Sequence, residues 1–393
     1  MRLAYVCTDR GVPIFGRKGG SIHAQEVIRH LVRAGVDVEI IAARGGGDPP
    51  PCLSAVGWHE LPRRRGDDDA AKERAALVAN EHVRARLLEL GPFDAVYERH
   101  ALWSFAAMEY ARDAGIPGVL EVNAPLLEEQ RRYRTLVHDA EAAAAVERVF
   151  AAASVILAVS DQVAASIAGA YPDAAPVRVN ANGVDPARFQ PMPPASRAAP
   201  GSITTGFVGT LKPWHGVDLL IDAMAARPPS ERPSRLLVVG DGPMRGDLET
   251  LARTRGLEAA EFTGAVAPSE IPGLLASMDI AVAPYPSLPD FYFSPLKIFE
   301  YMAAGRPIVA AAIGQIDQLL TDGVTALLHP PGDLDAMTNA IHRLHEDAAL
   351  RRRLGEAARR VASREHTWEA VTRRILDAIE SYARRRGPVQ PVR

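Results

Sequence analysis

The chain has 393 residues, 47% hydrophobic and 24% charged, and its 45 Lys and Arg against 48 Asp and Glu give a net charge of -3. This composition predicts a soluble globular protein of about two domains, and it argues against a disordered chain, a fibre or a nucleic-acid binder. No apolar run approaches the ~18 residues that span a bilayer, and the opening segment is too short and mixed for a signal peptide, so a cytoplasmic location is expected.

In the first half of the chain, short apolar runs alternate with helical stretches, which predicts a parallel sheet covered by helices. The predicted strands of this half are Leu3 to Thr8, Asp37 to Ala43, Asp94 to Arg99, Gly118 to Val122, Val155 to Ser160 and Val177 to Asn180. A long helix is expected over Leu126 to Ala153. The loops Gly45 to Pro51 and Arg63 to Asp69 are expected to be solvated and flexible.

The same alternation returns in the second half of the chain. Its predicted strands are Thr204 to Gly209, Arg235 to Gly240, Glu261 to Gly264, Ile280 to Pro284, Ile308 to Ala311 and Ala326 to Leu328. Between the halves, Pro191 to Gly201 is rich in Pro and Ala and has the composition of an interdomain linker. The sequence therefore predicts two doubly wound α/β domains, 1–195 and 202–365, with ligands outside the carboxyl ends of the strands. The final segment, Thr367 to Arg386, predicts an amphipathic helix.

A glycine pair lies between the first strand and the helix that follows it. Gly19 and Gly20 belong to the stretch Gly16 to Glu26, in which Ser21 is the expected N-cap of the helix. Glycines lack Cβ atoms and let a phosphate approach the free amides at a helix start. A tight turn with positive φ would require the same glycines, so the stretch predicts either an anion site or a turn.

Two loops of the second half carry candidate ligand-binding side chains. The loop Phe207 to Gly216 contains two potential cations, Lys212 and His215, which suit a pyrophosphate, although a solvated loop has the same composition. The helix expected to begin near Ser294 contains Glu300. Its carboxylate could accept both hydroxyls of a ribose, or it could lie on an ordinary solvated face.

The sequence does not support metal or redox chemistry. Cys7 and Cys52 lie in no metal-binding or redox spacing, and the histidines are scattered without a His-Glu-x-x-His motif, so no metal site is predicted. The stretch Gly240 to Gly246 is similar to a dinucleotide fingerprint, but its spacing is one residue too long. No ribose-binding acid ends the next strand, which argues against a dehydrogenase.

Five segments occur in the order and spacing of one family. They are Val179 to Asp185 with Phe189, Phe207 to Gly216, Val239 to Pro243, Phe262 to Gly264 and Phe299 to Val309. On these segments nearly the whole chain resembles a family 4 glycosyltransferase of the GT-B fold, in a subgroup with a Ser-Pro-Leu-Lys variant. The resemblance implies two Rossmann-like domains facing a central cleft and a retaining sugar transfer from a nucleotide diphosphate, with no cofactor beyond this co-substrate.

The resemblance also implies site residues. Those expected to bind the donor are Gly19, Gly20, Gly209, Thr210, His215, Val266, Tyr292, Ser294, Leu296, Lys297 and Glu300. Those expected near the reacting groups are Lys212, Asn123 and His100. In the family, the glycine pair lies against the diphosphate, and the acid corresponding to Glu300 binds the ribose.

Several positions depart from the family pattern on the side of the transferred sugar. Tyr292 stands where a sugar-binding glutamate is usual, and Asp290 is a candidate substitute. Asn123 stands where many relatives have a histidine, and it cannot act as an acid or base. His100, at the end of another predicted strand, is a second candidate.

Positions expected to bind the diphosphate also depart from the family pattern. Thr210 and His215 stand where an Arg and a Lys usually neutralise the diphosphate, which leaves Lys212 and Lys297 as replacements. With no obvious nucleophile, the resemblance implies a front-face transfer in which the departing diphosphate accepts the proton of the acceptor hydroxyl.

The expected function is transfer of a sugar, from a UDP-sugar by default and a GDP-sugar next, to a hydroxyl of a glycan, lipid-linked or small-molecule acceptor. A GT-B nucleotide-sugar epimerase and a non-catalytic nucleotide-binding homologue are the alternatives. No nucleic-acid partner is expected, and membrane contact is at most peripheral. Arg131, Arg132 and Arg134 could meet an anionic acceptor or a membrane surface, or form a solvated face.

Overall fold

The structure, a computed structural model, describes residues 1–63 and 66–386, so residues 64–65 of the predicted loop 63–69 lie outside the described part. The described chain divides into two compact units: Met1–Ala181 with the C-terminal helix α14 (Trp368–Arg386), and Asn182–Thr367. Each unit is a parallel sheet covered by helices, which confirms the predicted α/β fold class. The chain leaves the first unit at Ala181, ahead of the Pro-rich segment and of the predicted boundary at 195.

The sheet of the first unit has the strand order β3-β2-β1-β4-β5-β6-β7, and its neighbours are parallel. Its strands are β1 (Arg2–Cys7), β2 (Asp37–Ala42), β3 (Gly57–Glu60), β4 (Ala95–Arg99), β5 (Gly118–Val122), β6 (Val155–Ala158) and β7 (Val177–Val179). Every predicted strand is present. The edge strand β3 is missing from the prediction, because its sequence Gly-Trp-His-Glu contains no apolar run. The strand order reverses between β1 and β4.

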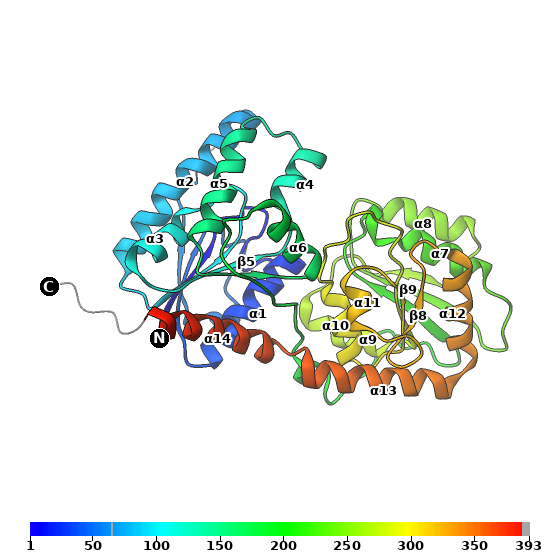
Figure 1. Cartoon of the computed structure of the whole chain (residues 1–393). Coiled ribbons are helices and arrows are strands. Elements are labelled where there is room, and N and C mark those ends of the chain that lie inside the picture. The colour runs from blue at the N-terminus through cyan, green and yellow to red at the C-terminus, as the bar shows by residue number, and fades with distance from the viewer. Residues whose placement is uncertain (64–65, 387–393) are drawn as a thin grey trace. The chain divides into compact units, whose positions relative to one another are not determined.

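Helices cover both faces of this sheet (Figure 1). On one face lie α2 (Asp69–Leu90), α3 (Ala106–Ala114) and α5 (Asp139–Ala152), and on the other lie α1 (Gly19–Arg33) and α14. The remaining elements of the unit are η1 (Pro51–Leu53), α4 (Leu126–Tyr133) and α6 (Asp161–Ala170).

The predicted single helix over Leu126 to Ala153 is wrong, because α4 ends at Tyr133 and α5 begins at Asp139. Between them, the amides of Val137 and His138 donate to the carboxylate of Glu73 on α2, over 2.8 to 3.2 Å. An amide bonded to a distant carboxylate does not bond the preceding turn, so the helix is interrupted there.

The predicted C-terminal helix is confirmed by α14. Its side chains Trp368, Val371, Ile375 and Ile379 are buried, and the helix packs against α1 and β5 of the first unit. The Trp368 ring meets the His23 ring of α1 edge to face, with centroids 5.2 Å apart. Burial of this apolar stripe, at roughly 25 cal/mol per Å², holds the last described helix on the unit that contains the N-terminus.

The sheet of the second unit has the order β10-β9-β8-β11-β12-β13, again with parallel neighbours. Its strands are β8 (Ile203–Val208), β9 (Ser234–Val239), β10 (Ala260–Phe262), β11 (Ile280–Ala283), β12 (Ile308–Ala311) and β13 (Leu327–His329). They agree with the predicted set to within one or two residues at each end, the usual uncertainty of element boundaries. Here the strand order reverses between β8 and β11.

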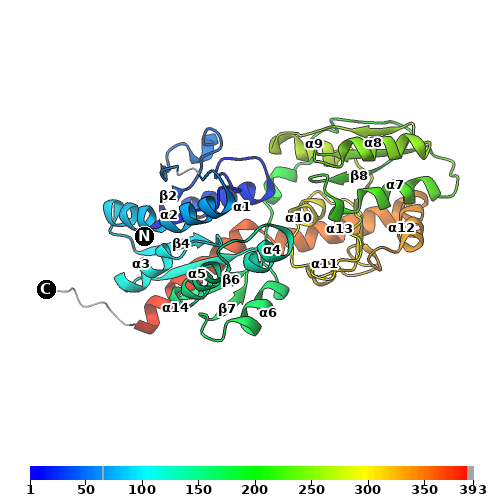
Figure 2. The same ribbon diagram turned by 90° about the horizontal axis from the view of Figure 1, so that it is seen from above.

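The helices of the second unit form two groups (Figures 1 and 2). Those on one face are α7 (Val217–Ala226), α8 (Arg245–Thr254) and α12 (Leu334–Glu346), while α10 (Leu296–Ala303) packs with α13 (Ala348–Glu365). The other elements are η2 (Pro186–Phe189), η3 (Pro213–His215), η4 (Pro268–Glu270), α9 (Ile271–Ala276) and α11 (Gln315–Leu319). Throughout residues 1–63 and 66–386, no helix has both the length and the apolar character needed to cross a membrane.

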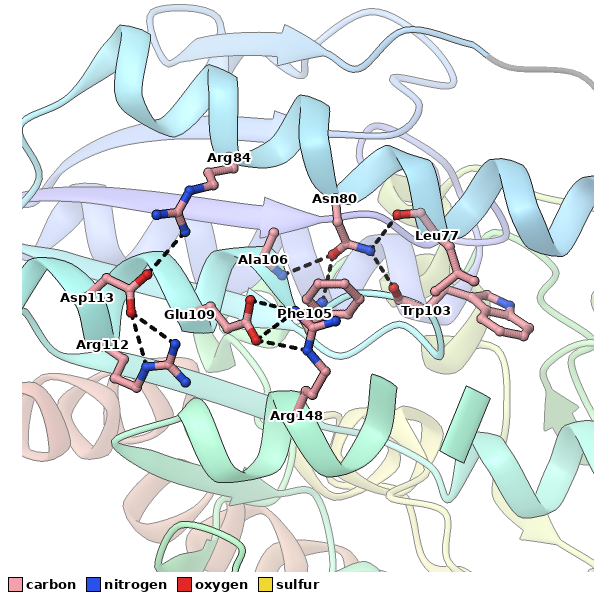
Figure 3. A network of polar contacts seen from close by, with 10 residues as sticks. All are labelled: Leu77, Asn80, Arg84, Trp103, Phe105, Ala106, Glu109, Arg112, Asp113 and Arg148. Atoms are coloured by element: carbon pink, nitrogen blue, oxygen red, sulfur yellow. Dashed lines mark hydrogen bonds and ion pairs between the residues drawn. The ribbon is translucent and has the colours of Figure 1, made fainter. Parts of the chain in front are cut away.

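A buried asparagine of α2 fixes the loop after β4 (Figure 3). Asn80 donates through Nδ2 to the carbonyl oxygens of Leu77, at 2.9 Å, and Trp103, at 2.8 Å. Its Oδ1 accepts from the amides of Phe105, at 2.9 Å, and Ala106, at 3.0 Å. All the bonding capacity of this amide is therefore used to hold the entry into α3.

We expect Asn80→Ala to destabilise the protein by about 2–4 kcal/mol, because it leaves buried backbone groups without partners. The matched control is Gln130→Ala, which removes an exposed amide that makes one bond, to the Thr135 carbonyl at 2.8 Å. Urea unfolding measures both variants. Equal midpoints for Asn80→Ala and the wild type would show that this network does not hold the loop.

Candidate functional site

Two loops meet where the strand order of the second unit reverses. One follows β8 and leads to α7, and the other follows β11 and leads to α10. Gly216, with φ of +67°, allows their close approach, because a Cβ at this position would clash with the carbonyl oxygen of Pro284. Doubly wound domains bind ligands at such a reversal. Both loops carry predicted donor-binding residues.

Lys297, in the first turn of α10, is a buried cation between these loops. Its side chain is 8% exposed, and Nζ lies 4.0 Å from the ring centroid of Phe207 and 5.2 Å from that of Tyr285. Nζ has no hydrogen-bond partner within the described residues. A Cβ on Gly209, whose φ is +152°, would lie 2.8 Å from Nζ. Burial lowers the pKa of Lys297 to about 7, while Glu300 acts in the opposite direction. This ammonium group lacks the anion that would stabilise it.

The loop after β8 offers less positive charge than its sequence suggests. His215 bonds through Nδ1 to the Thr210 carbonyl oxygen, and burial followed by the charge of Lys297 lowers the pKa of His215 to about 3. The imidazole is therefore neutral at pH 7. Thr210 is exposed, and Lys212 lies with Nζ 5.5 Å from the ring centroid of Trp214. In this fully described loop, Lys212 supplies the positive charge.

Glu300 lies one turn after Lys297 and forms an ion pair with Arg188, with 3.3 Å between Oε1 and Nη1. Through Nη2, Arg188 also donates to the carbonyl oxygen of Pro268, at 2.7 Å. Pro268 is two residues after Val266, so Arg188 connects the predicted ribose-binding acid to the loop expected to meet the base. The Glu300 side chain is 18% exposed, so the alternative of an ordinary solvated carboxylate is wrong.

The segment before α10 is held by Asn182, which belongs to the family segment Val179 to Asp185. Asn182 donates its amide N–H to Ser294 Oγ, at 3.2 Å, and its Nδ2 to the Ser294 carbonyl oxygen, at 2.6 Å. The helix begins at Leu296, slightly later than predicted. Tyr292, where the family has an acid, lies against Phe293 with ring centroids 4.5 Å apart. An aromatic surface thus stands at the position where a sugar-binding glutamate was expected.

In the first unit, the glycine pair begins a helix. Gly19 and Gly20 are the first two residues of α1, where backbone amides lack helical partners. Neither has a positive φ, so the alternative of a strained turn is wrong. The predicted N-cap is also wrong: Lys18 is the N-cap, without a side-chain cap, and Ser21 lies inside the helix. The backbone amides that the predicted anion site requires are therefore present at the start of α1.

Asn123 and His100 lie on different faces of the first sheet, because Asn123 meets Glu121, which bonds to His23 of α1, whereas His100 packs against α5. Asn123, which follows β5, donates through Nδ2 to the Glu121 carboxylate. The His100 ring packs on Phe150 of α5, with centroids 5.3 Å apart, and burial lowers the pKa of His100 to about 4. The structure does not bring these two residues together, which argues against a catalytic role for His100.

Sequence reasoning missed a polar cluster around Glu121. The available signal was the presence of charged residues inside apolar strands, Glu98 and Arg99 in β4 and Glu121 in β5, since buried parallel strands are otherwise continuously hydrophobic. Among residues 1–63 and 66–386, no group of three or more His, Cys, Asp or Glu side chains is placed to hold a metal ion. The cluster is therefore one of hydrogen bonds and ion pairs.

A cavity of about 820 Å³ opens in the first unit beside the ends of β1, β2 and β4. Its lining includes Asp9 and Arg10 after β1, Lys72 of α2, Trp103 in the loop that Asn80 holds, and Arg134 after α4. The cavity wall thus contains a carboxylate, several cationic side chains and an indole ring. Such a lining suits a hydroxyl-rich ligand, which needs both donors and acceptors and an apolar face for its ring.

Comparison with known proteins covers both units. Residues 17–188 match the family model described as Glycosyltransferase Family 4, and residues 202–347 match that described as Glycosyl transferases group 1. Alpha-D-kanosaminyltransferase of Streptomyces kanamyceticus is 33% identical over 155 residues, which is 39% of each chain. A D-inositol 3-phosphate glycosyltransferase of Salinispora tropica is 28% identical over 405 residues, covering 93% of this chain and 81% of that relative.

The fold also resembles that of solved glycosyltransferase structures. The crystal structure of Anabaena HepE in complex with UDP superposes with a TM-score of 0.72 at 20% identity, covering 97% of this chain and 100% of that chain. Two doubly wound domains with ligand loops at their strand reversals place the protein in the class of GT-B glycosyltransferases, as predicted. Because both units also match family models, the chain belongs to glycosyltransferase family 4.

Proposed function

We propose that the protein is a retaining glycosyltransferase that moves a sugar from a UDP-sugar to a hydroxyl of a small-molecule acceptor, without a metal ion or further cofactor. The observation that carries this proposal is Lys297, a buried ammonium group without a hydrogen-bond partner among the described residues, beside Gly209, which directly follows β8. The diphosphate of the donor supplies the missing anion. The UDP in the HepE complex supports the choice of nucleotide.

The second unit would bind the nucleotide. Lys297 and Lys212 stabilise the charge that grows on the departing diphosphate, and the backbone at Gly209 lies against a phosphate. Glu300 accepts the ribose hydroxyls, and backbone groups near Val266 meet the base. Lysine side chains meet the need for positive charge that a metal ion meets in other transferases.

The first unit would hold the reacting groups. The amides of Gly19 and Gly20 bind the diphosphate at the start of α1, and Asn123 bonds to the transferred sugar. The carboxylate of Glu121 already accepts several hydrogen bonds and is thereby unsuited to act as a nucleophile. A front-face transfer, in which the leaving diphosphate accepts the acceptor proton, needs no such nucleophile.

We assign the cavity of the first unit to the acceptor. Its volume suits a sugar or cyclitol, and the name of one relative above, a D-inositol 3-phosphate glycosyltransferase, supports an acceptor of this kind. Of the three arginines considered from the sequence, Arg131 pairs with Asp139 and Arg132 lies over Tyr133, whereas Arg134 lines the cavity.

We expect Arg134→Ala to raise KM for the acceptor about tenfold, because a contact to a charged side chain contributes roughly 1.4 kcal/mol. The dissociation constant of UDP should not change. Arg132→Ala is the matched control, since Arg132 belongs to the same segment but does not line the cavity. An unchanged acceptor KM in Arg134→Ala would contradict the assignment of the cavity.

The function is tested by incubating the protein with UDP-, GDP-, ADP- and dTDP-sugars and measuring release of the nucleoside diphosphate with and without a panel of cyclitol and sugar acceptors. Acceptor-dependent release, unaffected by EDTA, with retained anomeric configuration in the product by NMR, supports the proposal. Conversion of the donor alone to an epimer would identify an epimerase. Binding of nucleotide without turnover on any pair would identify a non-catalytic homologue.

A further inference from the structure

A buried carboxylate lies beneath the start of α1. Glu121, on β5, is 4% exposed, and its two oxygens accept from side chains of α1, of β4 and of the segment after β5. Arg99 Nη1, at 2.6 Å, and Asn123 Nδ2 donate to Oε1. His23 Nε2, at 2.7 Å, and the Tyr97 hydroxyl bond to Oε2. The carboxylate thereby fixes the direction of each donor.

Both members of the Arg99–Glu121 pair are charged at neutral pH. Burial alone raises the pKa of Glu121, but His23 and Arg99 outweigh it and hold the pKa of this carboxyl well below its usual range. The Arg99 side chain is only 11% exposed. A buried ion pair contributes little net stability, because desolvation offsets the attraction, so stability alone does not account for a guanidinium at this position.

The other ionisable neighbours of Arg99 do not complete its bonding. Burial, as the largest cause, raises the pKa of Cys7 to about 12 and that of Tyr5 well above its usual range, so both are neutral. Asp9 Oδ1 accepts from the Gly11 amide at 2.7 Å. Within the described residues, the Nη2 group of Arg99 donates to no protein acceptor, while Nη1 is used by Glu121.

The unused edge of Arg99 faces the glycine pair. A Cβ on Gly20 would lie 3.5 Å from Arg99 Nη2, so the guanidinium is immediately beside the second residue of α1. The amides of Gly19 and Gly20 have no helical partner there. Ser21, 1% exposed, has a hydroxyl without a hydrogen-bond partner in the described part of the chain. The guanidinium and the helix-start amides thus lie together, while Ser21 Oγ, in the same turn, would lie 2.6 Å from a Cβ on Gly16.

We propose that Arg99 is a phosphoryl-binding residue, which bonds through Nη2 to an anion seated on the amides of Gly19 and Gly20, and that Glu121 positions it. The inference rests on the proposed function for the identity of the anion, a phosphoryl group of the donor. Arginine suits this role because one edge can bind a carboxylate while the other binds a phosphate.

The test is calorimetric titration of UDP, uridine and inorganic pyrophosphate into the wild type and Arg99→Lys. Lysine keeps the charge but cannot bond Glu121 and an anion along two edges. We expect UDP and pyrophosphate to bind at least about tenfold more weakly, with uridine unchanged. Arg148→Lys is the control, because Arg148 of α5, whose side chain is half exposed, also pairs with a glutamate of the same unit, Glu109, at 2.9 Å (Figure 3).

A second variant tests the same position without altering the ion pair. Gly20→Ala requires no unusual φ, and it places a methyl group 3.3 Å from Val12 Cγ2 and 3.5 Å from Arg99 Nη2, beside the proposed anion. We expect it to weaken UDP and pyrophosphate at least about tenfold as well. Its control is Gly169→Ala in α6, where an added Cβ meets nothing within 4 Å. Thermal melting of each variant separates loss of binding from loss of folding.

The outcomes separate this inference from the proposed function. Unchanged pyrophosphate and UDP affinity in folded Arg99→Lys and Gly20→Ala would overturn the role of Arg99, and so would a wild type that binds neither ligand. If pyrophosphate binds in an Arg99-dependent way but no nucleoside diphosphate binds, the assignment of Arg99 stands and the proposed function fails. A role of Arg99 in folding alone would lower the melting temperature without a selective loss of the charged ligands.

Discussion

Glu300→Gln should lower kcat/KM for the sugar-nucleotide donor roughly 100-fold, because a carboxylate that accepts two ribose hydroxyls loses its charge and one acceptor. Glutamine keeps the shape of the side chain, and Arg188 keeps its bond to the Pro268 carbonyl, so the local structure should persist. Steady-state kinetics with the natural donor measures the effect. The largest part should appear in KM if the ribose is bound equally in the ground state and the transition state.

A ribose-specific readout separates this role from a structural one. The wild type should bind UDP more tightly than 2′-deoxy-UDP, and Glu300→Gln should lose most of this preference. Glu249→Gln is the control, because Glu249 also pairs with an arginine, Arg245 at 2.8 Å, in the same unit. Transfer at the wild-type level by Glu300→Gln would remove Glu300 from the site.

Lys297→Met should lower kcat by about 100- to 1000-fold, the effect of removing a preorganised charge from the leaving group. Methionine fills a similar volume and suits contact with the Phe207 and Tyr285 rings. The protein should therefore remain folded. Arg255→Met is the control, since Arg255 is exposed and pairs with Asp222, at 2.7 Å, in the same unit. Full activity in Lys297→Met would contradict the proposed diphosphate site.

The titration of Lys297 gives this variant a second, opposite signature. Its pKa, lowered by burial to about 7, lies below that of a lysine in the unfolded chain. The unfolded state then holds the proton more tightly, so the destabilisation is complete below pH 7 and fades as pH rises toward about 10.5. Lys297→Met should thus be more stable than the wild type by a few kcal/mol at pH 6, and the difference should shrink at pH 9, as urea unfolding can show.

The same pKa predicts how donor binding depends on pH. Because the diphosphate binds the charged ammonium, kcat/KM for the donor should fall as pH rises above about 7, and UDP binding near pH 8 should take up a proton. Calorimetry in buffers of different ionisation enthalpy measures that proton. Lys297→Met should take up none, and proton uptake equal to that of the wild type would mean that another group titrates.

Prediction from sequence succeeded where the signal was local. Continuous apolar runs identify buried parallel strands, so the strands of both units were predicted except β3, which is short and carries no such run. The interruption between α4 and α5 was not predictable in this way, because Glu73, which binds the Val137 and His138 amides, is 64 and 65 residues away in sequence.

For the candidate site too, some features were predictable from the sequence and others only from the structure. Gly19 and Gly20, Lys297 and Glu300 were identifiable because their residue types recur at fixed positions after strands.

What the sequence determined by itself was thus the order of the elements, the family and these motif positions, since each depends on neighbours in the chain. Only the tertiary structure decided that Lys297 is buried without a partner, and that Arg188 holds Glu300 across 112 residues. It also placed Arg99 between a buried carboxylate and the glycine pair. These are properties of packing, in which desolvation and distant partners set the charge and direction of each side chain.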